Sequence, residues 1–381
     1  MAEICLSYLN SEQVRAISAN ISPVILIPFL EYCSVYWGTH AKKDLSDDAR
    51  SLALELFQDY DHISTGFLLE RVERVPRLDT GFSGMHCASS FGIVEVVATL
   101  LERGCCGINE RDFLGYIPLA WAARNGHEGV VRILLRQEEA SPDKPDDYGQ
   151  TPLSFAAQNG HEGVVKILLG CEEVSPEKPE SCGQTPLSYA ACGGHEGVVT
   201  VLLERGGVNP GKPDNCGQTP LSYAARSGYE GVVRILLGQE EVNPDKPSSG
   251  GQTPLSHSAC GGHEGVVTML LGRGEVNPDK PDNDGRTPFL HAPRRGHMEV
   301  MKMLLGREEA NPDKPDNCGL SPLSYAACGG HEGVVTILLG REEVKPDRLD
   351  NDDLSPLLYA AWRGHGGVVG ILSEGGRSTP T

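Results

Sequence analysis

Long hydrophobic runs are missing from this sequence. The longest apolar stretch, residues 21–30, is interrupted by Pro23 and Pro28. It therefore cannot form the roughly 20-residue apolar helix that crosses a bilayer. The N-terminus, MAEICLSYLN, also has no basic segment followed by an apolar core. We expect neither a signal peptide nor a membrane span.

Positive charge and aromatic residues are also scarce. The chain has 33 Lys and Arg against 52 Asp and Glu, a net charge of −19, and only 6% aromatic residues. No cluster of Lys and Arg with interleaved aromatics occurs, so nucleic acid and anionic membranes are disfavoured as partners. The 12 cysteines form no CxxC pair. This pattern is typical of free thiols in a reducing compartment and predicts an intracellular, cytoplasmic protein.

Catalytic signatures are absent as well. No Ser–His–Asp arrangement, paired-carboxylate pattern or metal-ligand set rises above the repeated background. Residues 206–212 read GGVNPGK, close to a phosphate-binding loop. The next residue, however, is Pro213, where such a loop needs Ser or Thr for Mg²⁺, and neither a strand nor a helix is expected beside it. We expect no enzyme activity, no cofactor, no metal and no small-molecule substrate.

A 34-residue repeat dominates what is present. The string GQTPLSFAAQNGHEGVVKILL begins at Gly149 and recurs almost unchanged further along the chain. Such self-similarity at a fixed period indicates a stacked repeat architecture. Nine units fill residues 81–381, with close copies beginning at Gly183, Gly217 and Gly251, looser ones at Gly115, Gly285 and Gly319, a truncated one at Asp353 and a divergent one at Gly81.

Each unit predicts two short helices and an extended finger. Thr151 and Pro152 suit the cap and first turn of a helix, and Gly160 suits its end. The apolar residues of 164–169 predict the buried stripe of a second helix, which Gly170 ends. Two prolines within residues 175–179 then exclude a helix and predict an extended connection to the next unit.

These motifs, T-P-L, A-A, G-H, V-V and L-L in register, resemble the ankyrin repeat over residues 81–381. The resemblance implies an all-α solenoid of about nine units that binds a protein through an extended concave face. Two features depart from the family pattern. Ser154 and its equivalents stand where the family usually has His, so the Thr–His side-chain bond is missing or replaced, and the finger is longer.

Residues 1–80 predict a separate, small helical module that packs on the first repeat. Apolar residues at helical spacing fall in 29–37 and in 49–57, the latter after Ser46 as a cap, and a third helix is expected over 63–75. Residues 32–40, YCSVYWGTH, resemble a segment that follows the NTPase module in fungal NACHT–ankyrin proteins. That resemblance implies the ligand-sensing end of a signalling protein. The alternative is a free-standing scaffold or adaptor with no ATPase module.

Two columns of side chains recur with the repeat. The histidines are interpreted as structural residues at the helix–helix turn, because repeats stack too far apart for a shared metal ion. The aromatic column is interpreted as core filling, with a stacking platform as the alternative. The columns are His127, His161, His195, His263, His297, His331 and His365, and Trp121, Phe155, Tyr189, Tyr223, His257, His291, Tyr325 and Tyr359. Residues 353–381 are expected to form a C-terminal cap.

Candidate binding residues are those that vary on a constant scaffold. In the ankyrin family the two residues after A-A and the finger tips face the partner. The alternative is an ordinary solvated surface. The candidates are Arg124, Asn125, Gln158, Asn159, Arg226, Ser227, Arg286, Arg294, Arg295, Trp362 and Arg363, with Cys192–Gly193, Cys260–Gly261 and Cys328–Gly329 at the same positions in the other repeats.

The unit that begins at Gly285 stands apart. Pro293 replaces the second Ala and should weaken its first helix. Arg286, Arg294 and Arg295 concentrate positive charge there, which predicts a binding hot spot for carboxylates. The alternative is that Arg294 and Arg295 only neutralise neighbouring acidic residues.

Overall fold

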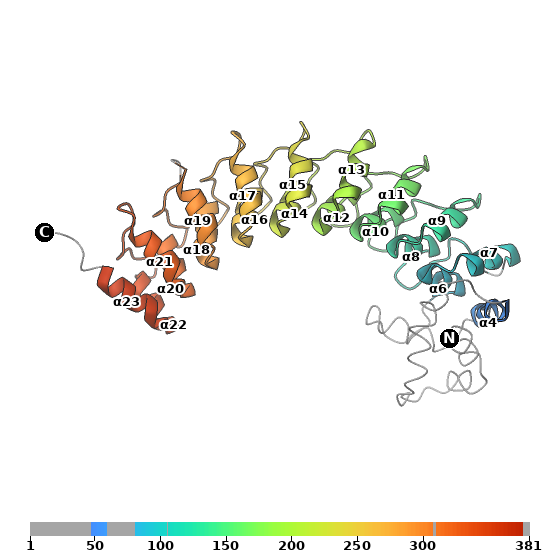
Figure 1. Cartoon of the computed structure of the whole chain (residues 1–381), viewed down its shortest axis with the longest axis horizontal. Helices are drawn as coiled ribbons and strands as arrows, with labels where there is room; N and C mark the ends of the chain where they lie inside the picture. The colour runs from blue at the N-terminus through green and yellow to red at the C-terminus, as the bar shows by residue number, and fades with distance from the viewer. Residues whose placement is uncertain (1–46, 59–80, 105, 308–309, 376–381) are drawn as a thin grey trace, which may run out of the picture. The chain divides into compact units, whose positions relative to one another are not determined.

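The computed structural model describes residues 47–58, 81–104, 106–307 and 310–375 (Figure 1). Every regular element in these ranges is an α-helix. The chain divides into two compact units, residues 1–181 with 204–206, and residues 182–203 with 207–381.

The helices after α4 (Asp47–Gln58) come in pairs, and the first helices of successive pairs begin 34 residues apart from Pro118 to Pro356. The predicted register therefore holds without a break. The pairs are α6 (Gly84–Phe91) with α7 (Val94–Arg103), α8 (Pro118–Arg124) with α9 (Glu128–Leu135), α10 (Pro152–Gln158) with α11 (Glu162–Leu169), α12 (Pro186–Gly193) with α13 (Glu196–Glu204), α14 (Pro220–Ser227) with α15 (Glu230–Leu237), α16 (Pro254–Gly261) with α17 (Glu264–Leu271), α18 (Pro288–Arg295) with α19 (Met298–Leu305), α20 (Pro322–Gly329) with α21 (Glu332–Leu339), and α22 (Pro356–Arg363) with α23 (Gly366–Gly375).

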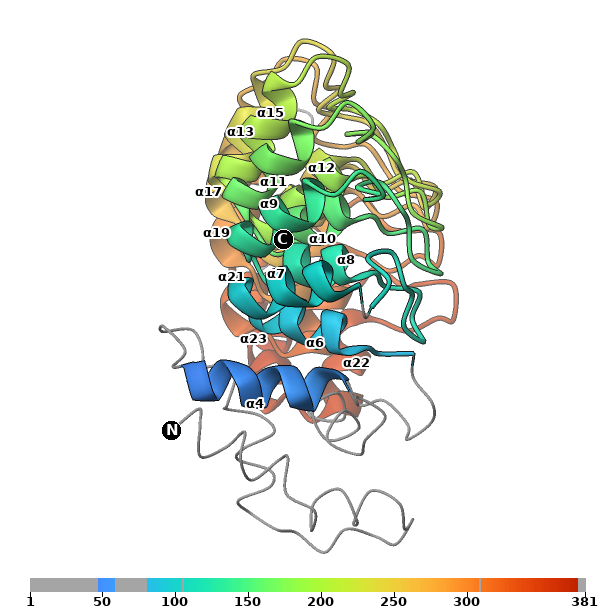
Figure 2. The same cartoon turned by 90° about the vertical axis from the view of Figure 1, so that its right-hand side faces the viewer.

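Within each unit the helices form two layers. Second helices such as α13, α15 and α17 lie in one layer and first helices such as α12 in the other (Figure 2). First helices contact first helices, as in α14, α16 and α18, and second helices contact second helices, as in α15, α17 and α19. The apolar residues that the repeat pattern selects lie between these layers and are buried. Leu255, Ala259, Val266 and Leu270 of one repeat, for example, are all fully buried. Each repeat thus completes the core of its neighbour.

The first helix begins at a Thr–Ser pair. In α10 the amide of Ser154 donates to Thr151 Oγ1 at 3.2 Å, and the two hydroxyl oxygens lie 3.1 Å apart. The Thr–His bond of the family is therefore replaced rather than missing. The first, divergent repeat keeps a histidine at this position. There His86 contacts Ser83 and, through Nε2, the carbonyls of Glu110 and Tyr116.

A second recurring device is an aspartate at the base of the finger. Asp214 Oδ1 accepts hydrogen bonds from the amides of Cys216 and Gln218, which fixes the turn. Its other oxygen, Oδ2, accepts the hydroxyl of Tyr223 at 2.5 Å, nine residues later on α14. One buried carboxylate thus joins the finger to the first helix that follows it.

Ion pairs connect each finger to the next. Lys280 Nζ lies 2.8 Å from Asp245 Oδ2, and Lys314 Nζ lies 2.5 Å from Asp279 Oδ2, each across one repeat. Arg348 and Asp313 form the same pair further on. The recurring P-D-K-P sequence is therefore a ladder in which each cation binds the aspartate one repeat earlier.

This ladder predicts the effect of restoring its missing aspartate. Gly211 stands where one repeat has Glu177 and the others that share the P-x-K/R motif have Asp, one repeat before Lys246. We expect Gly211→Asp to raise the free energy of unfolding by about 0.5–1 kcal/mol, the contribution of a partly exposed ion pair. A Cβ at residue 211 would lie 3.1 Å from the Glu241 carbonyl oxygen, which must move by a few tenths of an ångström to admit it. Asp245 holds the equivalent position in the next repeat. Thermal melting checks this prediction. The control Asp245→Asn should lower the free energy of unfolding by a similar amount. A Gly211→Asp variant that is no more stable than the wild type at low salt would contradict the prediction.

Glycine at the finger tip satisfies two constraints at once. Gly319 has φ +82°, and a Cβ there would lie 2.7 Å from Asn351 Oδ1 of the next finger. The equivalent residue of the last repeat is Asp353, the only non-glycine residue with positive φ in the described part of the chain (φ +60°). No further finger among the described residues packs against it, so only the backbone constraint remains there.

We therefore expect Asp353→Gly to stabilise the last repeat by about 0.5–1 kcal/mol, because an L-residue in this conformation costs about 1–2 kcal/mol and the extra freedom of unfolded glycine offsets part of it. Gly319→Asp is the matched control and should destabilise by more, since it adds a clash to the strain. Chemical denaturation measures both. If the two variants change the free energy of unfolding by equal amounts of opposite sign, the neighbouring finger adds nothing to the cost of Asp at residue 319.

Of the sequence predictions about the two ends of the chain, the structure tests one. The helix expected after Ser46 is confirmed as α4, which contacts α6 and α7. The helices expected in 29–37 and 63–75, and the domain boundary at residue 80, lie outside the described residues. The C-terminal cap expected over residues 353–381 stays a prediction; within it, Leu358 and Trp362 of α22 are 50% and 74% exposed.

Candidate partner-binding face

Except for Arg286, which precedes α18, the candidate residues lie at the C-terminal ends of first helices. Arg124 and Arg286 are half-buried, and the others are exposed. We call these residues, without Arg286, the first-helix face of their compact unit. It comprises Arg124, Asn125, Gln158 and Asn159 in the first unit, and Arg226, Ser227, Arg294, Arg295, Trp362 and Arg363 in the second.

Two candidates also bind the backbone of the scaffold. Asn125 Nδ2 donates to the carbonyl of Ser90 at 3.1 Å, which connects α8 to α6. Asn159 Nδ2 donates to the carbonyl of Phe155 at 2.9 Å, within its own helix end. These amides therefore help to terminate and join helices, and a partner would meet them already engaged.

The arginines of the face lie over aromatic rings. The guanidinium carbon of Arg294 is 5.5 Å from the ring centroid of Tyr325 on the next first helix. Arg226 lies 6.0 Å from Tyr223 and Arg363 5.3 Å from Trp362. Such cation–π contacts hold a guanidinium at the surface while its N–H groups stay available.

Arg286, by contrast, is engaged within the chain. Its guanidinium lies 2.6 Å from Asp284 and 3.6 Å from Asp316, and it donates to the Tyr325 hydroxyl at 3.3 Å. Burial by itself lowers the pKa of Arg286, but the hydrogen bond to Tyr325 and the charges of Asp284 and Asp282 raise it overall. Of the three arginines predicted as a hot spot, only Arg294 and Arg295 point their charge at solvent.

The aromatic column is part of the scaffold, and the sequence did not reveal how. Trp121 Nε1 donates to Asp112 at 2.9 Å, and Tyr325 and Tyr359 donate to Asp316 and Asp350. Burial and the hydrogen bond to Asp214 likewise raise the pKa of Tyr223 far above its usual range. The signal was the constant nine-residue spacing from Asp to Tyr or Trp, which marks a structural pair.

This pattern breaks in the sixth and seventh repeats. His257 faces Ser248 in place of an aspartate, and its Nε2 has no hydrogen-bond partner among the described residues. His291 Nε2 lies 3.4 Å from Asp282 Oδ2, too long for a good hydrogen bond. Burial, together with the charges of Arg226 and His291, lowers the pKa of His257 to about 4. Burial also lowers the pKa of His291, against the opposing effect of Asp282.

The histidine column at the helix–helix turns joins neighbouring repeats. His263 Nε2 lies 2.9 Å from the carbonyl of Arg226, and its ring lies against Gly228 so closely that a Cβ there would clash at 2.4 Å. His297 contacts the carbonyl of Cys260 in the same way at 3.1 Å. These rings satisfy the last carbonyls of the preceding first helix, which is a structural role.

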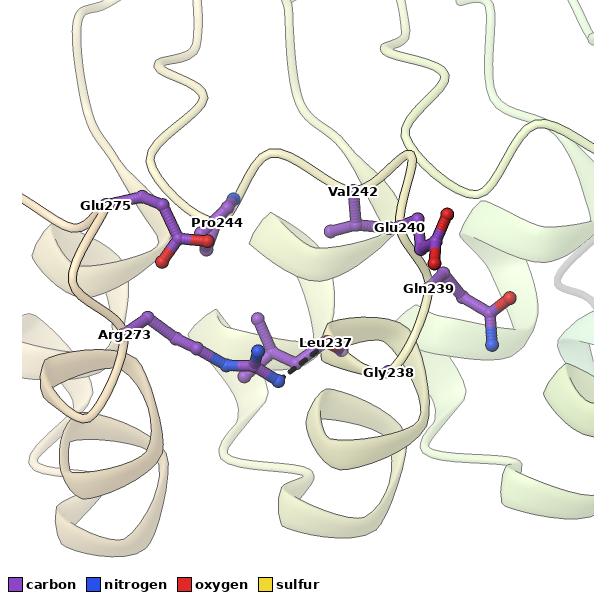
Figure 3. Close-up of a pocket in the computed structure, with 8 residues that line it drawn as sticks. All are labelled: Leu237, Gly238, Gln239, Glu240, Val242, Pro244, Arg273 and Glu275. Atoms are coloured by element: carbon purple, nitrogen blue, oxygen red, sulfur yellow. Dashed lines mark hydrogen bonds between the residues drawn. The ribbon is translucent and has the colours of Figure 1, made fainter.

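A small depression between α15 and the turn after α17 is polar (Figure 3). Arg273 donates to the carbonyl of Leu237 at 2.7 Å, as Arg307 does to Leu271 one repeat later. The depression encloses 190 Å³, below the roughly 300–1,000 Å³ of small-molecule sites. We interpret it as part of the repeat packing. Its lining residues are Leu237, Gly238, Gln239, Glu240, Val242, Pro244, Arg273 and Glu275.

The loop resembling a phosphate site lies in a finger. The amide of Gly211, which a bound phosphate would need as a donor, already donates to Asn209 Oδ1 at 2.9 Å. This contact and Pro213 both disfavour phosphate binding at this loop. None of the helices in the described ranges has the length and apolarity needed to cross a bilayer.

The helix pairs recur every 34 residues, bury apolar residues between their two layers and are joined by fingers. This arrangement defines a helical repeat solenoid. The family model for ankyrin repeats (3 copies) matches residues 85–179, 165–247, 240–316 and 294–379. The chain therefore belongs to the ankyrin-repeat family. A comparison with curated proteins returns no match.

Proposed function

We propose that this chain is a protein-binding array that captures its partner on the first-helix face. The observation that carries the proposal is the contrast between that face and its support. Caps, turns and core repeat almost unchanged, whereas the two residues after A-A differ among five repeats and read Cys–Gly in three others. A constant scaffold with variable exposed positions is how repeat proteins acquire specificity.

The array is further proposed to be the ligand-sensing end of a NACHT-type signalling protein. The support is the resemblance of residues 32–40 to the segment that follows the NTPase module in that family. The other candidate is a free-standing scaffold or adaptor. A nucleotide-binding module encoded in the same reading frame upstream would favour the first, and its absence from the full transcript would favour the second.

Capture on the immobilised array tests the binding role. The face variant Gln158→Ala/Arg226→Ala/Arg294→Ala/Trp362→Ala should lose the proteins that the wild-type array retains from lysate of the native cell. A matched variant of the second helices, Arg132→Ala/Arg234→Ala/Lys302→Ala, should keep them. Capture that survives in the face variant, or that both variants lose equally, would refute binding by this face.

A further inference from the structure

Charge is segregated between the two helix layers. The first helices carry five arginines, Arg124, Arg226, Arg294, Arg295 and Arg363, and not one Asp, Glu or Lys. Most second helices carry a glutamate in their first turn, such as Glu230 and Glu264. A chain with a net charge of −19 thus presents one purely cationic helix layer.

The arginines on α14, α18 and α22 are not neutralised by carboxylates of the described residues. Arg226, Arg294, Arg295 and Arg363 form no ion pair with a carboxylate among the described residues. Elsewhere the chain pairs its cations, as in Lys302–Glu299 and Arg348–Asp313. The alternative that Arg294 and Arg295 neutralise neighbouring acids therefore finds no support in this geometry.

These arginines also alternate with helices that end in small residues. Arg226, Arg294 and Arg363 lie on α14, α18 and α22, whereas α12, α16 and α20 end in Cys–Gly. Because glycine has no side chain, few side-chain atoms project from the surface between successive arginines. Packed helices lie about 8–10 Å apart, so arginines two repeats apart are separated by roughly 16–20 Å.

We propose that α14, α18 and α22 bind an extended acidic segment of the partner protein, with carboxylates grouped about every five to six residues. An extended chain advances about 3.3 Å per residue, so five to six residues match the separation of the arginines. Carboxylates suit guanidinium groups because both can form two parallel hydrogen bonds. The Cys–Gly ends leave room for the backbone between these contacts. This inference rests on the proposed function and names the chemistry of the partner.

Selection from a display library of random peptides tests the inference. Peptides of about 20 residues exceed the roughly 12 needed to reach from α14 to α22. On the wild-type array, the selected pool should be enriched in Asp and Glu at separations of five to six residues. On the charge-reversed variant Arg226→Glu/Arg294→Glu/Arg363→Glu, the same library should yield Lys and Arg at those separations.

Single peptides from the acidic pool give the second measurement. Fluorescence anisotropy should show about tenfold weaker binding to Arg226→Ala/Arg294→Ala/Arg363→Ala, because several exposed ion pairs are lost together. The variant Arg132→Ala/Arg234→Ala should bind as the wild type does, and circular dichroism should show all variants folded.

The failures of the two proposals are distinguishable. Selected peptides without acidic enrichment, or peptides whose affinity ignores the three arginines, would overturn the acidic segment and leave the binding role intact. Selected peptides that are acidic but show no preferred separation of Asp and Glu would overturn the proposed spacing of five to six residues. If the wild-type array enriches no peptide above a support without protein, the result would count against both proposals.

Discussion

Replacing Pro293 by Ala should raise the thermal midpoint of the array and its free energy of unfolding by about 1–3 kcal/mol. Pro293 is buried inside α18. It has no amide to donate to the carbonyl of Phe289, and its ring crowds that carbonyl. The cost is below the value for a long helix interior because α18 ends at Arg295, two residues later.

The start of α18 is weakened as well. Leu290 replaces the serine that pairs with the cap, and its amide donates to the Thr287 carbonyl at 2.9 Å instead of to the hydroxyl. Thr287 Oγ1 is buried and has no hydrogen-bond partner among the described residues. A buried polar group left in this way costs about 1–3 kcal/mol. The seventh repeat therefore combines a poor cap with an internal proline.

Ala327→Pro provides the matched control, because Ala327 holds the same position in α20, where the Ser321 cap is intact. It should destabilise the array by at least the amount that Pro293→Ala gains. Urea denaturation followed by circular dichroism measures both variants. A Pro293→Ala midpoint at or below the wild-type value would mean that α18 has adapted to its proline and is not the weak repeat.

Acidification from pH 7 to pH 5 should destabilise the second compact unit, residues 182–203 with 207–381. His257 alone should lower its free energy of unfolding by about 2 kcal/mol. Its pKa is lowered to about 4 in the folded chain by burial, and then by the charges of Arg226 and His291. The unfolded chain takes up a proton near pH 6.5, while the folded chain does not. Stability is therefore full above pH 6.5 and falls as the pH drops from 6.5 toward 4. His291, whose pKa is also lowered by burial, adds in the same direction.

The neighbouring repeats suggest the variant that removes this dependence. His291→Tyr would place a hydroxyl near Asp282, as Tyr325 does near Asp316. His257→Tyr needs Ser248→Asp as well, because residue 248 has no carboxylate to accept the hydroxyl. The triple variant should lose much less stability between pH 7 and pH 5 than the wild type. His86, whose pKa burial lowers to about 4, remains in both proteins and cancels in the comparison. Parallel pH profiles for the two proteins would show that the histidine pair is not the acid-sensitive element.

The candidate face was only partly predictable from the sequence. The positions after A-A were identified correctly as exposed ends of first helices, because a helix end is defined by nearby residues such as Gly228. Which of the cations remain available was not predictable. Arg286 and Arg294 are eight residues apart and equally charged, yet the first is tied to Asp284, Asp316 and Tyr325 and the second lies over a ring.

The sequence by itself determined the fold, the repeat boundaries and the places where the pattern fails. Its signals act within one repeat: the Thr–Pro cap, the glycines that accept positive φ and the apolar stripe each depend on residues a few positions apart. Only the tertiary structure decided the contacts made from one repeat to the next. The bonds of Lys280 to Asp245 and of His263 to Arg226 span 35 and 37 residues. Such contacts exist only when stacked neighbours fix the distance between the two atoms, which no local pattern specifies.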